Sequence, residues 1–481
     1  MADLRYHQVS LSTLLILMVM LHESAAAKCQ MLSIDVGCDE CTYNGHCVPG
    51  SVPVDPWTNF ALYTQRELQI DEPFDKVSFL DAHNAYNNRA DGYGKNDTCA
   101  WPPPYRELCW GFANQEFSIT DMLNMGIRGV EMDNWFCRDA MRLAHLGSNI
   151  KIGCQDDDKL YSDGIKEIAD WLNTDGNQLE IVRIYLNEKQ DQGHDDLMND
   201  PITEYLGSKV FTPRDLNDTY KGYWPTLRQM RKDGKNVVIA TGSTAGSGEL
   251  YTHGDVYIHK LYWSDRQYRR FTPYPECGGK TENSGAVRYY SDSTHYPAIS
   301  DGPTSVGFVS NYWELLKCRI EFPAGDQVNP KLMKTAVYTW AEGEPSEPLV
   351  SNSCIKMNGE DNRWYVANCE EELHYACQHS DDLSDWTISE SRGPYTITEH
   401  VCPPYYNFIA PQNGYRYQKL IEASKGSTIW INFSPWLPYY EDPDLGHLTT
   451  APSDSYRLVS SRWTYMLWLV SFVPLATTCF Y

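Results

Sequence analysis

Short apolar runs of strand length alternate with segments of helical periodicity from about Phe74 onward. The runs that predict strands lie at 77–82, 129–133, 141–144, 179–186, 235–240 and 256–261. Segments 118–125 and 163–172 predict helices, and Ser118 is a suitable N-cap for the first. Parallel strands need a crossover, usually a helix, so the alternation predicts an α/β fold with a parallel sheet.

The chain is long enough for one large barrel with further segments at both ends. It has 481 residues, of which 42% are hydrophobic, so a sizeable core is available. The pattern weakens beyond Tyr262, and the run at 334–340 is the predicted last strand. We therefore expect a TIM-type (β/α) barrel over residues 57–345, with a small cysteine-rich segment before it and a disulfide-stapled extension after it.

Both ends of the chain carry predicted targeting signals. The apolar run at 11–21 is followed by Ser24 and three alanines, so residues 1–27 are a predicted signal peptide. The last residues, 463–481, carry no charge and contain Pro474, which makes them marginal as a spanning helix. Small residues near Ser453 and a polar spacer precede them, so 453–481 is a predicted GPI-attachment signal. A buried C-terminal strand and a tail anchor are the alternatives.

Fifteen cysteines indicate an oxidising compartment. The segment 28–56 holds a group of them, Cys29, Cys38, Cys41 and Cys47. This group predicts a small disulfide knot, because a zinc site would need a well-spaced second ligand pair. Loss of Cys479 with the C-terminal tail would leave fourteen cysteines, an even number that permits full pairing. The extension at 346–452 carries further cysteines.

The net charge restricts the partners. A formal charge of −24 argues against nucleic acid, and also against adsorption to anionic lipid by bulk electrostatics. An anionic substrate would have to be met by local positive charge or by a metal ion.

Polar and ionisable side chains lie at the C-terminal ends of four of the predicted strands. In chain order they are His83 and Asn84, Glu131 and Asp133, His145, and Glu188. Glu131 and Asp133 are two residues apart, so both face one side of their strand. A lone His or Glu-x-Asp at a strand end is usually a solvated loop feature, but their joint occurrence favours a site. In a parallel barrel the C-terminal rim is where active sites are built.

Three motifs in this region resemble a known family. The first begins at His83 and reads His-Asn-Ala-Tyr, the second runs from Gly126 through Glu131-Met-Asp133, and the third begins at His145. Their order resembles the catalytic X region of the phosphatidylinositol-specific phospholipases C, a TIM-type barrel family. The resemblance is good over 74–188 and looser to about 340. The third motif departs from the family's His-Gly, because Leu146 is inserted.

The resemblance implies a phosphoric diester hydrolase that acts on inositol phospholipid or a similar diester at a membrane surface. His83, His145 and Glu131 would be catalytic. His83, or a carboxylate such as Glu131, would remove the proton of the substrate hydroxyl, and His145 would protonate the leaving alkoxide. The expected first products are a cyclic phosphate and a free lipid.

The resemblance also implies calcium. Family members with an arginine in place of Asp133 work without metal, and those with an acid there bind Ca²⁺. The implied ligands are Asn84, Glu131, Asp133 and Glu188, with Asn187 as an alternative to the last. These hard oxygen donors suit calcium.

The two predicted targeting signals and the cysteine content place the chain in the secretory pathway. We expect the mature protein at the extracellular cell surface on a GPI anchor. Sequons at Asn96, Asn217 and Asn432 fit a glycoprotein.

Two alternative functions stay open. The stretch from Trp340 through Glu344-Pro345 to Cys377 resembles the closing segment of C-type lectins, which would suggest a non-catalytic surface binding protein. A glycerophosphodiester phosphodiesterase also uses Glu-x-Asp, but normally has His-Arg-Gly where this chain has His83-Asn-Ala.

Overall fold

The computed structural model describes residues 37–42, 45–93, 113–144, 154–187, 189–190, 193–241, 258–259, 263–281, 283–291, 308–347, 349, 353–396 and 400–433. The predicted signal peptide, the attachment signal, His145, Glu188 and the Asn96 sequon lie outside these residues. Among the helices that the structure describes, none combines the length and apolarity needed to cross a membrane.

A nine-stranded parallel sheet forms the centre of the molecule. Its order is β10-β11-β12-β1-β2-β5-β8-β7, and β9 also pairs with β8. The strands are β1 (Asp81–Ala82), β2 (Gly129–Glu131), β5 (Val182–Leu186), β7 (Val210–Phe211), β8 (Val237–Thr241), β9 (Ile258–His259), β10 (Trp263–Gln267), β11 (Ala286–Tyr290) and β12 (Phe322–Gly325). The predicted α/β fold with a parallel sheet is therefore confirmed.

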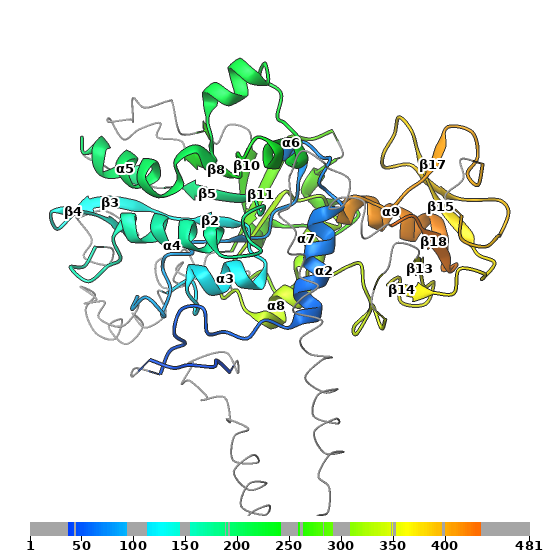
Figure 1. Cartoon of the computed structure of the whole chain (residues 1–481), viewed down its shortest axis with the longest axis horizontal. Helices are drawn as coiled ribbons and strands as arrows, with labels where there is room; N and C mark the ends of the chain where they lie inside the picture. The colour runs from blue at the N-terminus through cyan, green and yellow to red at the C-terminus, as the bar shows by residue number, and fades with distance from the viewer. Residues whose placement is uncertain are drawn as a thin grey trace, which may run out of the picture.

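The sheet is curled, but it is not the closed barrel that the sequence predicted (Figure 1). Strands β7 and β9 share the outer edge of β8, and each pairs with it over two residues only. Within the described strands nothing joins this edge to β10. Among the described residues, two-residue ladders are all that β8 forms at this edge, which is too little pairing to close a barrel.

Helices surround the sheet (Figure 1). They are α2 (Pro56–Glu67), α3 (Ile119–Met125), α4 (Tyr161–Asn173), α5 (Asp195–Pro201), α6 (Leu227–Lys232), α7 (Tyr312–Leu316) and α8 (Pro330–Lys334). The two predicted helices are confirmed as α3 and α4. The side chain of Ser118 accepts a hydrogen bond from the Asp121 amide, and Gly126 ends α3 at φ 114°.

The predicted third barrel strand belongs to a separate hairpin. Residues 141–144 fall on β4 (Ala140–Leu143), which pairs antiparallel with β3 (Asn134–Cys137), and β6 (Lys189–Gln190) adds a third strand. Arg138 and Asp139 form the turn at φ 52° and 58°. A two-residue turn of this kind joins antiparallel strands and leaves no room for a crossover helix. The prediction of a barrel strand here was therefore wrong.

The prediction of a last barrel strand at 334–340 was also wrong. Lys334 ends α8, and the next backbone amides donate elsewhere: that of Val337 to the Lys334 carbonyl and that of Tyr338 to Gln65 Oε1. Contacts with α2 bury this apolar run, and the only strand-like pairing found for it among the described residues is a single bridge between Trp340 and Trp364. The last strand of the sheet is β12, in the region where the sequence pattern had weakened.

The C-terminal part forms its own six-stranded sheet, of order β14-β13-β18-β15-β16, with β17 also paired to β15. Its elements are β13 (Cys354–Met357), β14 (Trp364–Ala367), β15 (His374–His379), β16 (Trp386–Ile388), β17 (Tyr406–Phe408), α9 (Gly414–Ser424) and β18 (Ile429–Ile431). The lectin-like stretch is thus one portion of a larger sheet. An ion pair between Arg416 and Glu72, at 2.5 Å, connects α9 to the first part of the chain.

Disulfides occur in the N-terminal cysteine-rich segment, in the region of the nine-stranded sheet and in the C-terminal extension. The described pairs are Cys38–Cys47, Cys137–Cys154, Cys277–Cys318, Cys354–Cys369 and Cys377–Cys402. Both the cysteine-rich segment and the C-terminal extension are therefore disulfide-bonded, as the sequence predicted.

Candidate active site

His83 follows β1 and is held by the neighbouring strand β12. Its backbone amide donates to the Gly325 carbonyl, and its ring Nδ1 lies 2.7 Å from Asp326 Oδ1. Both side chains are buried. Because β1 and β12 are parallel neighbours, the residues after their C-terminal ends meet. Asp326 was not predicted, since 322–325 was not recognised as a strand.

An amide network fixes this His–Asp pair. Asn114 Nδ2 donates to Asp326 Oδ2 at 3.1 Å, while Asn114 Oδ1 accepts from Asn84 Nδ2 and Asn87 Nδ2 at 3.2 and 2.7 Å. The Asp326 amide donates to Ser291 Oγ at 2.7 Å. With Nδ1 directed at a carboxylate, Nε2 is the ring nitrogen that remains for chemistry.

Glu131, the last residue of β2, lies on the other side of His83. His83 Nε2 is 3.9 Å from Glu131 Oε2, and the Asn84 amide donates to the same oxygen at 3.3 Å. Burial raises the pKa of Glu131, and the negative charge of Asp133 adds to this, whereas Arg288 and His83 oppose it.

Asp133 lies beside Glu131 and accepts a hydrogen bond from the Tyr86 hydroxyl at 3.2 Å. Four of the six predicted site residues are thus brought together by the ends of β1 and β2. They are His83, Asn84, Glu131 and Asp133. The other two, His145 and Glu188, lie in parts of the chain that the structure does not describe.

Arg288 on β11 is a site residue that the sequence reasoning missed. It is buried, its Nη2 donates to Glu131 Oε2, and its Nη1 lies 3.4 Å from Asp265 Oδ1. Burial would lower its pKa, but the carboxylates of Glu131 and Asp265 raise it well above the ordinary value. Arg288 therefore stays charged and balances Glu131.

Aromatic rings complete this side of the site. The Arg288 guanidinium lies 5.1 Å from the ring centroid of Tyr185 and 5.2 Å from that of Tyr290. The Tyr290 ring is itself 5.3 Å from the His83 ring. The one available signal was the strand-forming composition of 286–290, Ala-Val-Arg-Tyr-Tyr, which the weakened pattern around it obscured.

Asp81 and Arg183 form a buried charged layer beneath the site. Arg183 Nη2 donates to Asp81 Oδ2, and both side chains are almost fully enclosed. Gly129 is required opposite them, because a Cβ there would come within 1.5 Å of Asp81 Oδ1. Burial raises the pKa of Asp81, and the charge of Arg183 opposes the rise.

Two oxygens at the site fit the shell of a hard cation. Asn84 Oδ1 and Glu131 Oε1 are buried and have no hydrogen-bond partner. Such acceptors are typical calcium ligands. Among the described residues, no group of three or more His, Cys, Asp or Glu side chains could hold a metal. The amide of Asn84 is not of those types, so the residues present fit part of a calcium shell, and Glu188 would have to add to it.

Two sequence relatives cover most of the chain. The uncharacterized proteins MT2135 and Rv2075c, from two strains of Mycobacterium tuberculosis, are each 22% identical to it over 412 residues, which is 78% of this chain and 80% of theirs. Maintenance of telomere capping protein 6 of Candida albicans is 24% identical over 157 residues, covering 30% of this chain and 25% of that protein.

Two solved structures are also similar. The phosphatidylinositol-specific phospholipase C of Listeria monocytogenes shares 13% identity, covers 57% of this chain and 97% of its own, and has a TM-score of 0.34. A mutant of the Staphylococcus aureus enzyme of the same description shares 10% identity, with 58% and 99% coverage and a TM-score of 0.33.

A family model described as PI-PLC X matches residues 110–277. The matched segment contains Glu131 and Asp133, and the fold adds His83 and Asn84 from before it and Arg288 and Asp326 from after it. The predicted resemblance to the phosphatidylinositol-specific phospholipase C X family is confirmed for residues 110–277.

Proposed function

We propose that the chain is a phosphoric diester hydrolase of the phospholipase C type, acting on inositol phospholipid or a similar diester. One observation carries the proposal: the buried His83 ring lies between Asp326 at Nδ1 and Glu131 near Nε2. This arrangement suits a general base with a defined tautomer. It lies beside the segment that matches the PI-PLC X model.

In this mechanism His83 Nε2 removes the proton from a substrate hydroxyl next to the phosphodiester. Asp326 holds the ring and stabilises the imidazolium that forms, without taking the proton itself. The charge of Arg288 opposes the rise that burial gives to the pKa of Glu131. His145 is the proposed acid that protonates the leaving alkoxide, as the resemblance implies.

We further propose calcium as the cofactor, held by Asn84, Glu131, Asp133 and Glu188. When bound, the ion would lower the pKa of the substrate hydroxyl and neutralise charge at the phosphate. Support comes from the two unpartnered buried oxygens, Asn84 Oδ1 and Glu131 Oε1. The acids of the site would otherwise repel an anionic diester, because Glu131, Asp133, Asp265 and Asp326 all lie close to it.

Chelation of calcium is expected to abolish turnover, and added calcium to restore it. Asp133→Asn should need a higher calcium concentration for half-maximal rate, because one anionic oxygen is lost. The measurement is initial rate against free calcium. Asp361→Asn, a change at an exposed acid of the C-terminal sheet, should leave the curve unchanged. Full activity of the unmodified chain in excess chelator would remove calcium from the proposal.

A substrate panel tests the reaction class. The purified chain is incubated with phosphatidylinositol, a GPI-anchored protein and glycerophosphodiesters, with and without calcium. Cleavage of the inositol lipids supports the proposal, whereas cleavage of glycerophosphodiesters alone supports the alternative enzyme. Glycan binding with no turnover on any diester would favour the lectin-like alternative.

We also propose that the mature protein is extracellular and GPI-anchored. The five described disulfides support an oxidising compartment, and the Asn217 sequon is exposed. A bacterial GPI-cleaving phospholipase added to intact cells is expected to release the protein into the medium. A membrane form that still contains residues 463–481 would contradict the anchor.

A further inference from the structure

Asn114 is a fully buried side chain in the segment that leads into α3. Its carbonyl accepts hydrogen bonds from the Gln327 amide at 2.8 Å and from Gln327 Nε2 at 2.9 Å. The next residue, Gln115, donates through Nε2 to the carbonyls of His83 and Gly325 at 2.7 and 2.9 Å. The segment is therefore tied to the ends of β1 and β12, and the backbone of Asn114 is fixed beside the candidate site.

Asp326 decides which way the amide of Asn114 faces. A carboxylate only accepts hydrogen bonds, so the atom that lies 3.1 Å from Asp326 Oδ2 has to be the donor, Asn114 Nδ2. The oxygen of the same amide accepts from Asn84 Nδ2 at 3.2 Å and from Asn87 Nδ2 at 2.7 Å. A flipped amide would put its NH₂ group against two other NH₂ groups and its oxygen against a carboxylate. One orientation alone satisfies all three partners.

The amide of Asn84 is fixed in turn. Its Nδ2 is directed at Asn114, its backbone amide donates to Glu131 Oε2 at 3.3 Å, and its carbonyl accepts from the Asn87 amide at 3.0 Å. Its φ of 45° lies in the left-handed region, which asparagine adopts more readily than most side chains. Oδ1 remains, buried and without a hydrogen-bond partner. Asn114 therefore determines that Asn84 offers an oxygen, and not an NH₂ group, to a cation.

We propose that Asn114 is a positioning residue that couples the calcium site to the general base, an inference that rests on the proposed function. Through Asn84 it leaves the ligand oxygen open to the ion, and through Asp326 it helps to hold the His83 ring. Without Asn114 the amide of Asn84 can rotate and turn its NH₂ group toward the ion, which weakens binding. Asp326 loses a donor at the same time.

The first measurement is calcium binding by isothermal titration calorimetry, which needs no substrate. Asn114→Ala is expected to raise the Kd for calcium about tenfold, the scale of one lost hydrogen bond. Asn84→Ala removes the ligand oxygen itself and should raise the Kd at least as much. Because Asn114 acts on the ion through Asn84, the double variant should bind calcium no more weakly than Asn84→Ala alone.

The second measurement is kcat at saturating calcium. Part of the loss in Asn114→Ala should persist there, because calcium does not replace the donor to Asp326. Asn114→Ser provides a second variant, in case the alanine variant does not fold. Its hydroxyl is too short to reach both Asn84 and Asp326, so the Kd should rise and kcat should fall in the same directions.

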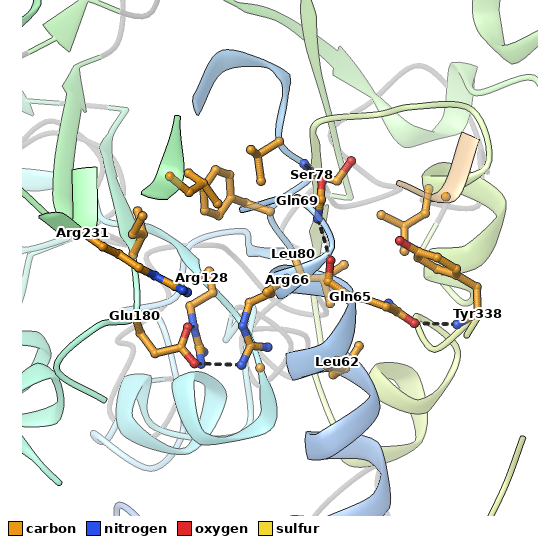
Figure 2. A pocket seen from close by; sticks show the side chains of 17 residues that line it. Leu62, Gln65, Arg66, Gln69, Ser78, Leu80, Arg128, Glu180, Arg231 and Tyr338 are labelled. Atoms are coloured by element: carbon orange, nitrogen blue, oxygen red, sulfur yellow. Dashed lines mark hydrogen bonds and ion pairs between the residues drawn. The ribbon is translucent and has the colours of Figure 1, made fainter. Parts of the chain in front are cut away.

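Asn236→Ala is the matched control. Asn236 is also buried, and its Nδ2 donates to the carbonyls of Gln178 and Glu180 at 3.0 Å each. These residues precede β5, at the opposite end of the sheet from the candidate site. Figure 2 shows the side chain of Glu180 there, where it accepts a hydrogen bond from Arg66. Asn236→Ala loses hydrogen bonds of a buried amide but should keep the calcium Kd of the unmodified chain.

The outcomes separate this inference from the proposed function. If the unmodified chain binds calcium and Asn114→Ala binds it with the same Kd, the inference alone is overturned. A double variant that binds about tenfold more weakly than Asn84→Ala would also overturn it, since Asn114 would then act independently of Asn84. If the unmodified chain binds no calcium, the proposed cofactor and the inference both fail.

Discussion

His83→Ala is expected to lower kcat/KM on the preferred diester by about 10²–10⁴-fold, the usual cost of removing a general base. The loss follows from the position of the ring, since no other described side chain presents a neutral base between Asp326 and Glu131. Steady-state kinetics on the best substrate of the panel give the measurement. Circular dichroism and chemical unfolding establish that the variant is folded.

Two further variants test whether Asp326 positions the His83 ring for catalysis. Asp326→Ala should lose less activity than His83→Ala, because Nε2 survives while the orientation of the ring is weakened. His374→Ala is the matched control, since His374 bonds to Ser389 in the C-terminal sheet, away from the site. Full activity in His83→Ala would refute the mechanism.

Arg183→Met is expected to destabilise the fold by about 3–5 kcal/mol, because it removes the hydrogen-bonded partner of the buried Asp81 carboxylate and leaves only Arg288 Nε, at 3.9 Å. Arg183 donates to Asp81 Oδ2, and its guanidinium lies 4.1 Å from the ring centroid of Phe322. Chemical unfolding of the variant and the unmodified chain gives the difference in free energy. Adding Asp81→Asn should recover most of the loss, since the side chain that lost its hydrogen-bonded partner then carries no charge.

The free energy of unfolding that Arg183→Met loses should depend on pH. Burial already raises the pKa of Asp81 in the folded chain, and removal of Arg183 takes away the larger of the two positive charges, Arg183 and Arg288, that oppose the rise. A folded state that binds the proton more tightly than the unfolded state loses stability as pH rises. The deficit of Arg183→Met should therefore shrink as pH falls toward about 4.

A surface pair provides the control for this prediction. Arg228→Met removes the partner of exposed Asp71 and should cost about 0–1 kcal/mol. The prediction would be contradicted if Arg183→Met lost no more unfolding free energy than Arg228→Met. It would also be contradicted if the loss in Arg183→Met did not depend on pH.

Local signals in the sequence were sufficient for part of the fold. The apolar spacing of 163–172 and the cap at Ser118 predicted α4 and α3, because both depend on neighbours within a few residues. The run at 334–340 has the composition of a strand, yet its amides donate to Gln65 and to its own turn. Burial by packing and burial by strand pairing leave the same apolar pattern in a sequence.

The residues of the candidate site could likewise be predicted only in part. The sequence by itself determined a parallel α/β chain with His83, Asn84, Glu131 and Asp133 at strand ends, because side-chain alternation and the succession of strands along the chain can be read from short stretches. Only the tertiary structure decided that Asp326, 243 residues away, orients His83 and that Arg288, 157 residues away, balances Glu131. Those contacts depend on β12 pairing with β1 and on β11 pairing with β12. The choice of neighbouring strand is made by the packing of the whole sheet, which no short stretch of sequence specifies.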